Sequence, residues 1–431
     1  MAMRVDDRSA VQSGHAGSSV VQGWFAMACV SLIALEFRPP LTISPVGPVM
    51  QQPPMWRPCL PPSILLYGLV RADEGDTRVL VQDLDTPCAV VDLDIMENNL
   101  RRCQTYLDRH GLGLRPHIKT HKIPEFAHLQ IRLGAKGVNC QKLGEAEVMA
   151  DAGIADILLT YNVIGQIKLD RLVALARRSD IKVVADSNEV IEGLSSAISR
   201  AGLELPVLVE CDTGAQRCGV TSPADALTLA QAIDRAPGLA FLGLMTYPPK
   251  NSVAKTNAWL TEAVDLCKRS GLAVENVSNG GTPDLYVAHE VTVATEHRPG
   301  TYIYSDRYHV ETHGFGAWAD CALRIHARVV SHAAPNRCVI DAGSKSLSSD
   351  LLGLKGFGRI LEHLEWEIYG LSEEHGHVGA PPGSEAPRIG ELVTVIPNHA
   401  CVVTNLYDRI YAARQGRVEA FYEVAARGKV Q

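Results

Sequence analysis

The sequence has no Cys-x-x-Cys pair, no long run of basic residues and no clear apolar run of membrane-spanning length. Its 11 cysteines are scattered without the spacing of a disulfide framework, which indicates free thiols in a reducing, cytoplasmic compartment. Lys and Arg number 41 against 48 Asp and Glu, and this net charge of -7 argues against nucleic acid or an anionic membrane as the main partner. We therefore expect a small-molecule partner.

The first 80 residues differ from the rest of the chain. An apolar stretch at residues 24–37 is followed by a Pro-rich segment at residues 39–62 that has no clear period. A signal peptide or membrane anchor is one interpretation, but the apolar stretch contains Glu36, is short for a spanning helix and lacks a clear cleavage site. We predict instead a poorly ordered extension over residues 1–80.

Short β-rich runs alternate with amphipathic stretches between residues 88 and 304. This repetition predicts an α/β fold, a (β/α)8 TIM barrel over residues 81–315, with a doubly wound open sheet as the alternative. Nine runs are one too many for eight strands, which leaves the first free to pair elsewhere. The predicted strands are residues 89–92, 114–119, 137–140, 157–161, 182–186, 207–211, 241–245, 275–278 and 299–303.

The pattern changes after about residue 316. Period-two runs with turn residues between them predict a second, mostly antiparallel β domain over residues 316–431. A chain of 431 residues is long enough for a barrel followed by such a domain. The predicted strands are residues 324–330, 338–342, 363–369, 392–396 and 418–424.

The densest cluster of reactive residues is Arg-Pro-His-Ile-Lys-Thr-His-Lys at residues 115–122, at the end of a predicted strand. In a βα barrel the C-terminal strand ends form the active face, so Lys119 is expected to point toward substrate. A lysine amine can form a Schiff base with an aldehyde cofactor. A solvated basic turn is the alternative interpretation of this cluster.

Two glycine-rich loops follow the seventh and eighth barrel strands, at residues 278–283 (Ser-Asn-Gly-Gly-Thr-Pro) and 298–301 (Arg-Pro-Gly-Thr). Barrels build phosphate sites there, because glycines let backbone N–H groups approach and a threonine hydroxyl adds a donor. A plain turn explains either loop alone. Together with Lys119 they indicate a site for pyridoxal 5'-phosphate (PLP).

The segment at residues 397–401 reads Pro-Asn-His-Ala-Cys. On a strand, residues two apart point to the same side, so His399 and Cys401 are placed to face one cation. An imidazole and a thiolate select a borderline-soft metal such as zinc. Core packing is the alternative for this pair.

These motifs resemble the D-serine dehydratase and D-threonine aldolase family of PLP enzymes, which has the alanine-racemase-like (type III) fold. The resemblance runs from residue 85 to residue 428, about four fifths of the chain, and the N-terminal extension has no counterpart in it. Further blocks of the resemblance lie at residues 85–87, 212–219, 280–282, 298–302, 341–345 and 372–376.

The resemblance implies roles for single residues. Lys119 is the expected Schiff-base lysine, and Arg217 is expected near the cofactor ring, by its phenolic oxygen. Tyr161 and Tyr247 are candidates for cofactor contacts, with core packing as the alternative, and His375 either reaches the site or lies in a polar turn. His399 and Cys401 are the expected metal pair, for zinc or else manganese or cobalt. The expected phosphate site consists of Gly280, Gly281, Thr282, Gly300 and Thr301.

The family acts on D-3-hydroxy amino acids and is expected to form homodimers. Its members with Cys at the second metal position resemble dehydratases and those with Asp resemble aldolases, so Cys401 favours dehydration to a 2-oxo acid and ammonia. Retro-aldol cleavage to glycine and an aldehyde is the alternative. A racemase and a non-catalytic PLP-binding protein are further alternatives; the His-x-Cys pair counts against the first, and the β domain counts against the second.

Overall fold

The structure is a computed structural model that describes residues 79–384 and 387–431. The predicted extension over residues 1–80, with its apolar stretch at residues 24–37, lies outside the described residues except for Val79 and Leu80. In the part that is described, no helix is both long and apolar enough to cross a membrane.

An eight-stranded sheet of parallel strands forms the barrel, in the order β2-β9-β8-β7-β6-β5-β4-β3. Its two ends meet, because the backbone N–H of Lys136 donates to Leu114 and that of Asn139 donates to Pro116. The barrel prediction is therefore confirmed over the open sheet. The strands are β2 (Gly113–Leu114), β3 (Val138–Cys140), β4 (Asp156–Leu159), β5 (Asp180–Ala185), β6 (Leu205–Cys211), β7 (Leu239–Thr246), β8 (Asn276–Asn279) and β9 (Glu296–His297).

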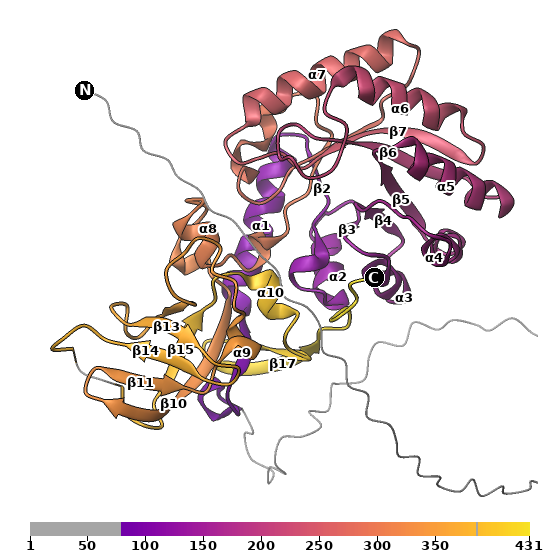
Figure 1. Cartoon of the computed structure of the whole chain (residues 1–431). Helices are drawn as coiled ribbons and strands as arrows, with labels where there is room; N and C mark the ends of the chain where they lie inside the picture. Colours follow the sequence, from indigo (N-terminus) through magenta and orange to yellow (C-terminus); the bar gives the residue numbers. More distant parts are fainter. Residues whose placement is uncertain (1–78, 385–386) are drawn as a thin grey trace, which may run out of the picture. The chain divides into compact units, whose positions relative to one another are not determined.

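Amphipathic helices between these strands cover the barrel, as Figure 1 shows for α4 to α7. In α5, for example, Val190, Leu194 and Ile198 recur at helical spacing and are buried. The helices are α2 (Pro124–Arg132), α3 (Leu143–Asp151), α4 (Gln166–Ala176), α5 (Asn188–Arg200), α6 (Pro223–Arg235) and α7 (Val253–Arg269).

A second, nine-stranded sheet follows the order β13-β14-β11-β10-β1-β16-β17, with β15 paired to β10 and β12 paired to β15. Strand β1 (Cys88–Asp92) lies antiparallel to β10 and parallel to β16, so the extra predicted strand does pair outside the barrel. The others are β10 (Leu323–Ala334), β11 (Arg337–Ile340), β12 (Arg359–Ile360), β13 (Glu367–Leu371), β14 (Gly376–Gly379), β15 (Leu392–Ile396), β16 (Arg409–Arg414) and β17 (Arg417–Glu423).

Helix α1 (Leu93–Arg109) joins the two sheets into one core. Its Leu100 and Leu107 belong to a buried cluster that also contains Leu114 of the barrel and Ile325 of the second sheet. The remaining helical segments are η1 (Val81–Asp83), η2 (Ile118–Thr120), η3 (Leu285–Glu290), η4 (Thr301–Ile303), α8 (Arg307–Glu311), η5 (Trp318–Asp320), α9 (Ser344–Leu347) and α10 (Ala400–Thr404).

Two predicted barrel strands are wrong in extent. The run at residues 114–119 forms a strand only as far as Leu114, and the run predicted at residues 299–303 forms one earlier, at Glu296–His297. Prolines follow both, at Pro116 and Pro299, and a proline has no N–H for a strand ladder. Both segments continue as loops and short 3-10 helices at the mouth of the barrel, where they carry candidate site residues.

Candidate active site

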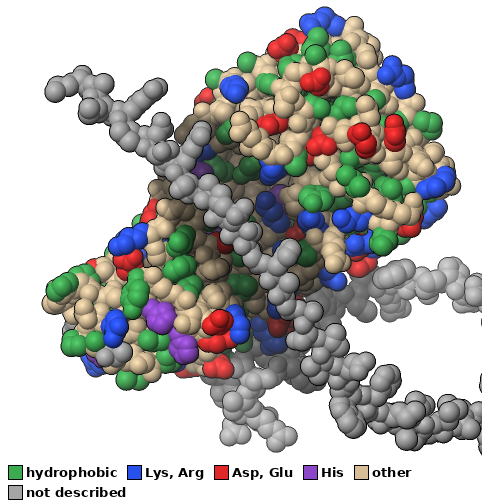
Figure 2. Space-filling model, viewed as in Figure 1, with side chains coloured by type: hydrophobic (Ala, Val, Ile, Leu, Met, Phe, Trp, Pro, Cys, Tyr) green, Lys and Arg blue, Asp and Glu red, His purple; other side chains and the backbone are tan. Residues whose placement is uncertain are grey.

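A cavity of about 420 Å³ opens where the C-terminal ends of the barrel strands meet the segments around α8 and α10. Figure 2 shows the surface hollowed between the barrel and the second sheet, with basic and histidine side chains inside. Its size is typical of small-molecule sites. The cavity is lined by all ten residues predicted for the site: Lys119, Arg217, Tyr247, Gly280, Gly281, Thr282, Gly300, Thr301, His399 and Cys401.

Two secondary candidates lie elsewhere. Tyr161 is 41% exposed, does not line the cavity, and its ring stacks under the Lys142 ammonium at 3.7 Å. His375 is exposed in the turn before β14 and is also absent from the cavity lining. The polar-turn interpretation of His375 therefore fits its position.

Lys119 is half-buried in the η2 turn, and its backbone is held by the preceding histidine. The Lys119 N–H donates to Nδ1 of His117 at 3.4 Å, so Nε2 of His117 carries the proton and donates to Oε1 of Gln141 at 3.0 Å. Burial, and then the charge of Lys119, hold the pKa of His117 well below its usual value. A neutral His117 thus positions the turn that presents the lysine.

The two glycine loops approach neighbouring residues too closely for a side chain. A Cβ atom on Gly281 would lie 2.8 Å from the Tyr247 ring, and one on Gly300 would lie 2.9 Å from Oγ1 of Thr120. The Gly300 N–H donates to Oγ1 of Thr282 at 3.2 Å, which ties the loops together. Backbone approach of this kind suits a phosphate group.

Two buried polar atoms of the cavity lining have no hydrogen-bond partner among the described residues. They are Oδ1 of Asn279 and Nδ1 of His297, both at the C-terminal strand ends. Because a buried polar atom without a partner costs free energy, the cavity has polar capacity left for a bound group.

Arg217 lies against the ring of Tyr247, with its guanidinium carbon 4.7 Å from the ring centre. Its Nη2 atom is 3.9 Å from Oε1 of Glu210, a buried carboxylate of β6 that the sequence did not single out. Burial raises the pKa of Glu210 to about 7, although the charge of Arg217 opposes the shift. Glu210 is thus the nearest anion to the predicted cofactor arginine in the described residues.

His399 and Cys401 do not lie on a strand, so the strand argument for this pair was wrong. Strand β15 ends at Ile396 before Pro397, His399 is the residue before α10, and Cys401 lies in its first turn. Both side chains nevertheless line the cavity, because α10 packs against the η2 turn that contains Lys119. Figure 1 shows α10 between the barrel and the second sheet.

The Cys401 sulfur is surrounded by donors. It lies 3.2 Å from Oγ1 of Thr120 and 3.6 Å from Oγ1 of Thr301. Burial alone would raise the pKa of Cys401, but the charge of His399, its hydrogen bond and the Lys119 ammonium lower it overall. The site therefore favours a thiolate, the form that binds metals.

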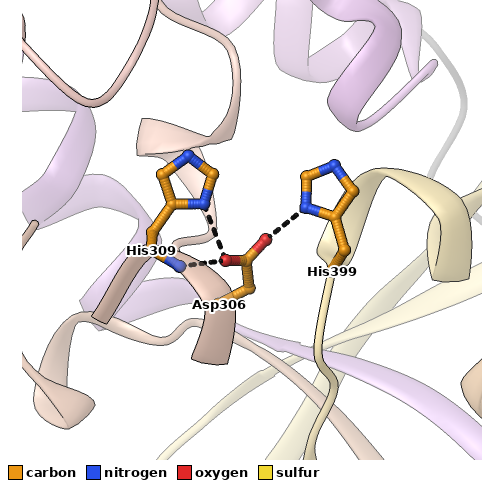
Figure 3. Close-up of side chains that lie close together, drawn as sticks. All are labelled: Asp306, His309 and His399. Carbon is orange, nitrogen blue, oxygen red and sulfur yellow. Dashed lines mark hydrogen bonds and ion pairs between the residues drawn. The ribbon is translucent and has the colours of Figure 1, made fainter. Parts of the chain in front are cut away.

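Asp306 is completely buried and accepts four hydrogen bonds at the start of α8. Its Oδ1 accepts from Nδ1 of His309 at 2.7 Å and from the His309 backbone at 2.9 Å. Its Oδ2 accepts from Nδ1 of His399 at 2.8 Å and from the Ala400 backbone at 3.0 Å. Figure 3 shows this symmetric arrangement, which we call the two-histidine cluster (Asp306, His309 and His399).

The cluster fixes how both rings are protonated. Because each Nδ1 donates to Asp306, Nε2 is the nitrogen of each ring that is left for another partner, and Figure 3 shows both Nε2 atoms on the side away from the carboxylate. Ser305, just before Asp306, has a φ of +51°, a left-handed conformation that costs about 1 kcal/mol or more in a residue with a side chain. Such local strain is typical of functional sites.

The cluster can hold a metal ion in two ways. Ligand atoms of Asp306, His309 and His399 lie within 4.8 Å of one another, so these three form one candidate site. Alternatively, His399 and Cys401 bind the ion while Asp306 orients the imidazole, as carboxylates commonly do behind metal-bound histidines. Either way, a divalent metal fits this end of the cavity.

Asp306 and His309 were missed by the sequence analysis. Their signal is Asp-x-x-His at residues 306–309, in which an N-cap aspartate accepts the N–H three residues on. An N-cap aspartate precedes many ordinary helices. Only the hydrogen bond from His399, which lies in a distant segment, indicates that Asp306 and His309 belong to the site.

Comparison with known proteins places the chain among well-described relatives. Residues 91–308 match the alanine racemase N-terminal domain family, and residues 322–413 match the serine dehydratase domain family. The chain is 36% identical to a D-threonine aldolase of Arthrobacter sp., covering 83% of this chain and 96% of that protein. It is 30% identical to a D-threo-3-hydroxyaspartate dehydratase of Delftia sp., covering 81% and 96%.

Solved structures agree with these relatives. The D-threonine aldolase of Filomicrobium marinum superposes with a TM-score of 0.77 at 34% identity, over 82% of this chain and 98% of that one. A cysteine-to-alanine variant of the D-threo-3-hydroxyaspartate dehydratase, solved in its metal-free form, superposes with a TM-score of 0.72 at 29% identity, over 80% and 98%.

Proposed function

The chain belongs to the alanine-racemase-like, fold type III PLP enzymes, in the group of D-threonine aldolase and 3-hydroxyaspartate dehydratase, and from this premise we propose its reaction and its site residues. It is a PLP-dependent lyase that acts on D-3-hydroxy amino acids. The observation that carries the assignment of residues is one cavity that contains a lysine, two glycine loops and a His–Cys pair.

The residues of the cavity fit PLP. The glycine loops approach Tyr247 and Thr120 too closely for a Cβ, and buried polar atoms of Asn279 and His297 lack partners in the described part of the chain. In our proposal Lys119 holds the cofactor through its amine, Arg217 and Tyr247 lie beside its ring, and the phosphate lies on Gly280, Gly281, Thr282, Gly300 and Thr301. When bound, PLP supplies an electron sink next to the substrate's α-carbon.

His399 and Cys401 hold the metal in this proposal, with zinc first and manganese or cobalt as alternatives. The metal supplies Lewis acidity at the β-hydroxyl of the substrate. Lys119, at the same cavity, takes the α-proton as a general base. The thiolate-favouring surroundings of Cys401 support the metal assignment.

Dehydration to a 2-oxo acid and ammonia is the first route that we propose. Its support is the His-x-Cys pair. D-threo-3-hydroxyaspartate dehydratase has been solved as a histidine-to-alanine variant and as a cysteine-to-alanine variant, and these two positions are two residues apart. The cysteine variant was solved in a metal-free form. His399 and Cys401 have the same spacing.

Retro-aldol cleavage to glycine and an aldehyde is the second candidate. It is favoured by the aldolases among the relatives, which are 36% and 34% identical to this chain against 30% and 29% for the dehydratase. We also propose a cytoplasmic homodimer with domains at residues 81–315 and 316–431, on the basis of the family resemblance and the composition.

Product analysis tests the proposal. Purified protein loaded with PLP and zinc is incubated with D-serine, D-threonine or 3-hydroxy-D-aspartate, and oxo acid with ammonia is measured separately from glycine with aldehyde. We expect Lys119→Ala to lose the borohydride-sensitive visible absorbance and at least about 10³-fold in turnover, because the site then lacks both its cofactor amine and its base.

The matched control is Lys142→Ala, a nearby lysine that stacks on Tyr161 outside the cavity lining. It should retain the absorbance and the products. A Lys119→Ala protein that keeps full turnover would overturn the assignment, and a protein that forms none of these products would overturn the lyase itself.

A further inference from the structure

We propose that His309 is a catalytic residue that moves the proton of the substrate's β-hydroxyl group. The inference rests on the proposed lyase function, because a D-3-hydroxy substrate brings this proton into the cavity. His309 lines the cavity, is 5% exposed and belongs to no motif of the family resemblance. Its role is therefore argued from geometry alone.

The first argument is the orientation of the ring. Asp306 accepts from both Nδ1 and the backbone N–H of His309, at 2.7 and 2.9 Å, so the imidazole cannot turn without breaking a buried bond. Nε2 is left as the free proton acceptor on the opposite side of the ring (Figure 3). A carboxylate that holds a histidine by Nδ1 is the usual arrangement for a general base.

The second argument is the distance between the two histidines. The ring centres of His309 and His399 are 6.1 Å apart, and the rings are 21° from parallel. Ligand atoms of the two histidines lie within 4.8 Å of one another, so His309 lies beside any ion that His399 holds. In our proposal the ion is held by His399 and Cys401, and His309 contacts the substrate oxygen instead.

The same spacing suits a bridging oxygen. An oxygen about 2.1 Å from a metal on His399 lies within hydrogen-bond reach, about 2.8 Å, of a second imidazole placed at this distance. In the proposed reaction that oxygen is the β-hydroxyl of the substrate. His309 is then the side chain next to its proton.

The proton balance differs between the two routes. In retro-aldol cleavage, Nε2 of His309 takes the hydroxyl proton, the Cα–Cβ pair goes to Cα, the aldehyde C=O forms, and Lys119 later returns a proton to Cα. In dehydration, His309 first takes a proton from solvent on Nε2; Lys119 then takes the α-proton, the C–O pair leaves with oxygen, and His309 gives its Nε2 proton so that water departs. In both routes the proton is transferred through Nε2 of His309.

Two variants test this role. His309→Asn keeps an amide near the position of Nδ1, so it can still bond to Asp306 while it lacks Nε2; His309→Gln is the second variant in case the first folds poorly. In the PLP- and zinc-loaded protein we expect turnover of a D-3-hydroxy amino acid to fall about 10²-fold or more.

Two further measurements separate catalysis from structure. Exchange of the α-protons of glycine with deuterated solvent, followed by NMR, needs Lys119 but no hydroxyl group, so the His309 variants should stay within about threefold of the parent. Zinc affinity, from chelator competition, and the visible spectrum of the cobalt-loaded protein should also be unchanged, because His309 is not a ligand in this proposal.

His363→Gln is the matched control. Its ring is also held by a carboxylate, with Nε2 3.2 Å from Oε1 of Glu391, but it lies outside the cavity lining. We expect its turnover to change less than about threefold.

The outcomes are distinct. Turnover of both His309 variants within threefold of the parent overturns the inference, as does a parallel loss of glycine exchange. A tenfold loss of zinc affinity also overturns it, because His309 would then be a ligand. If the parent protein itself neither exchanges glycine protons nor forms lyase products, the proposed function fails, and not this role alone.

Discussion

Glu296 and Asp306 are both carboxylates with an exposed fraction of at most 1%, yet their partners differ in kind. Glu296 accepts from Nε of Arg115, with both oxygens at 3.0 Å, and from the Ser278 hydroxyl. Arg115 in turn donates to Asp156 at 2.7 Å. These donors and acceptors satisfy one another, so the charge of Glu296 is neutralised locally.

Asp306 instead holds two histidines, each of which has a second nitrogen. Its charge is satisfied by the rings and two backbone N–H groups, while the Nε2 atoms lie on the side away from the carboxylate. We infer that the carboxylate paired with a guanidinium group stabilises the fold, whereas the carboxylate bonded to two imidazoles orients these rings for catalysis. The following three variants test this distinction.

The largest effect is expected on stability, for Glu296→Gln. The change leaves the buried Arg115 without the one carboxylate partner that is itself fully buried, and breaking a buried pair in this way costs about 3–5 kcal/mol. Urea denaturation of parent and variant measures the loss. Asp156→Asn is the control, since Asp156 is 31% exposed and its loss should cost less. A loss below about 1 kcal/mol for Glu296→Gln would contradict this view of the network.

Asp306→Asn is expected to act on activity more than on stability. An amide offers one acceptor oxygen, so it cannot hold both Nδ1–H groups, and one ring loses its orientation. We expect kcat/KM on a D-3-hydroxy amino acid to fall about 10- to 100-fold, the effect of removing a carboxylate behind a metal-bound histidine. Asp92→Asn is the matched control, because Asp92 caps α1 in the same way far from the cavity lining. Equal losses for the two variants would mean that Asp306 is only a helix cap.

Glu210→Gln tests a third kind of carboxylate, one that is buried but only loosely paired. Its pKa is raised from 4.5 to about 7, first by burial, so the folded state holds this proton more tightly than the unfolded state. Stability from this group is therefore present at low pH and falls as the pH rises from about 4.5 through 7. The variant stays neutral and should lose about 2 kcal/mol less than the parent between pH 5 and pH 8, at 1.4 kcal/mol per unit of pKa shift.

Denaturation at the two pH values measures this difference. Glu275→Gln, at an exposed position just before β8, is the control and should follow the parent curve. If the curve of Glu210→Gln also follows the parent, Glu210 is ionised in the folded protein, and Arg217 neutralises it more fully than its 3.9 Å separation suggests.

The sequence was sufficient to predict that Lys119, the glycine loops and the His–Cys pair line one cavity, because each lies in a short local motif. It also predicted the barrel, since βα alternation is a local signal. The errors came where a proline changes the local backbone: two strands end early, and the pair at residues 399 and 401 lies at the start of a helix. Residues that do line the cavity were thus predicted from an incorrect secondary structure.

Asp306 and His309 could not be predicted in this way. Their meaning depends on His399, which approaches from a segment 93 positions further along the chain than Asp306. A sequence shows neither which nitrogen of a ring is satisfied nor that two rings share one carboxylate. Glu210 was missed for the same reason, because its raised pKa comes from tertiary burial.

Strand β1 has a consequence for synthesis of the protein. Its partners, Leu323–His326 on β10 and Tyr411–Ala413 on β16, leave the ribosome long after β1 itself. The nascent chain must therefore keep an apolar edge, Ala89 to Val91, unpaired while the whole barrel is translated. The segment that carries His399 and Cys401 emerges between these two partners, so this end of the cavity is completed only after the barrel strands have been translated.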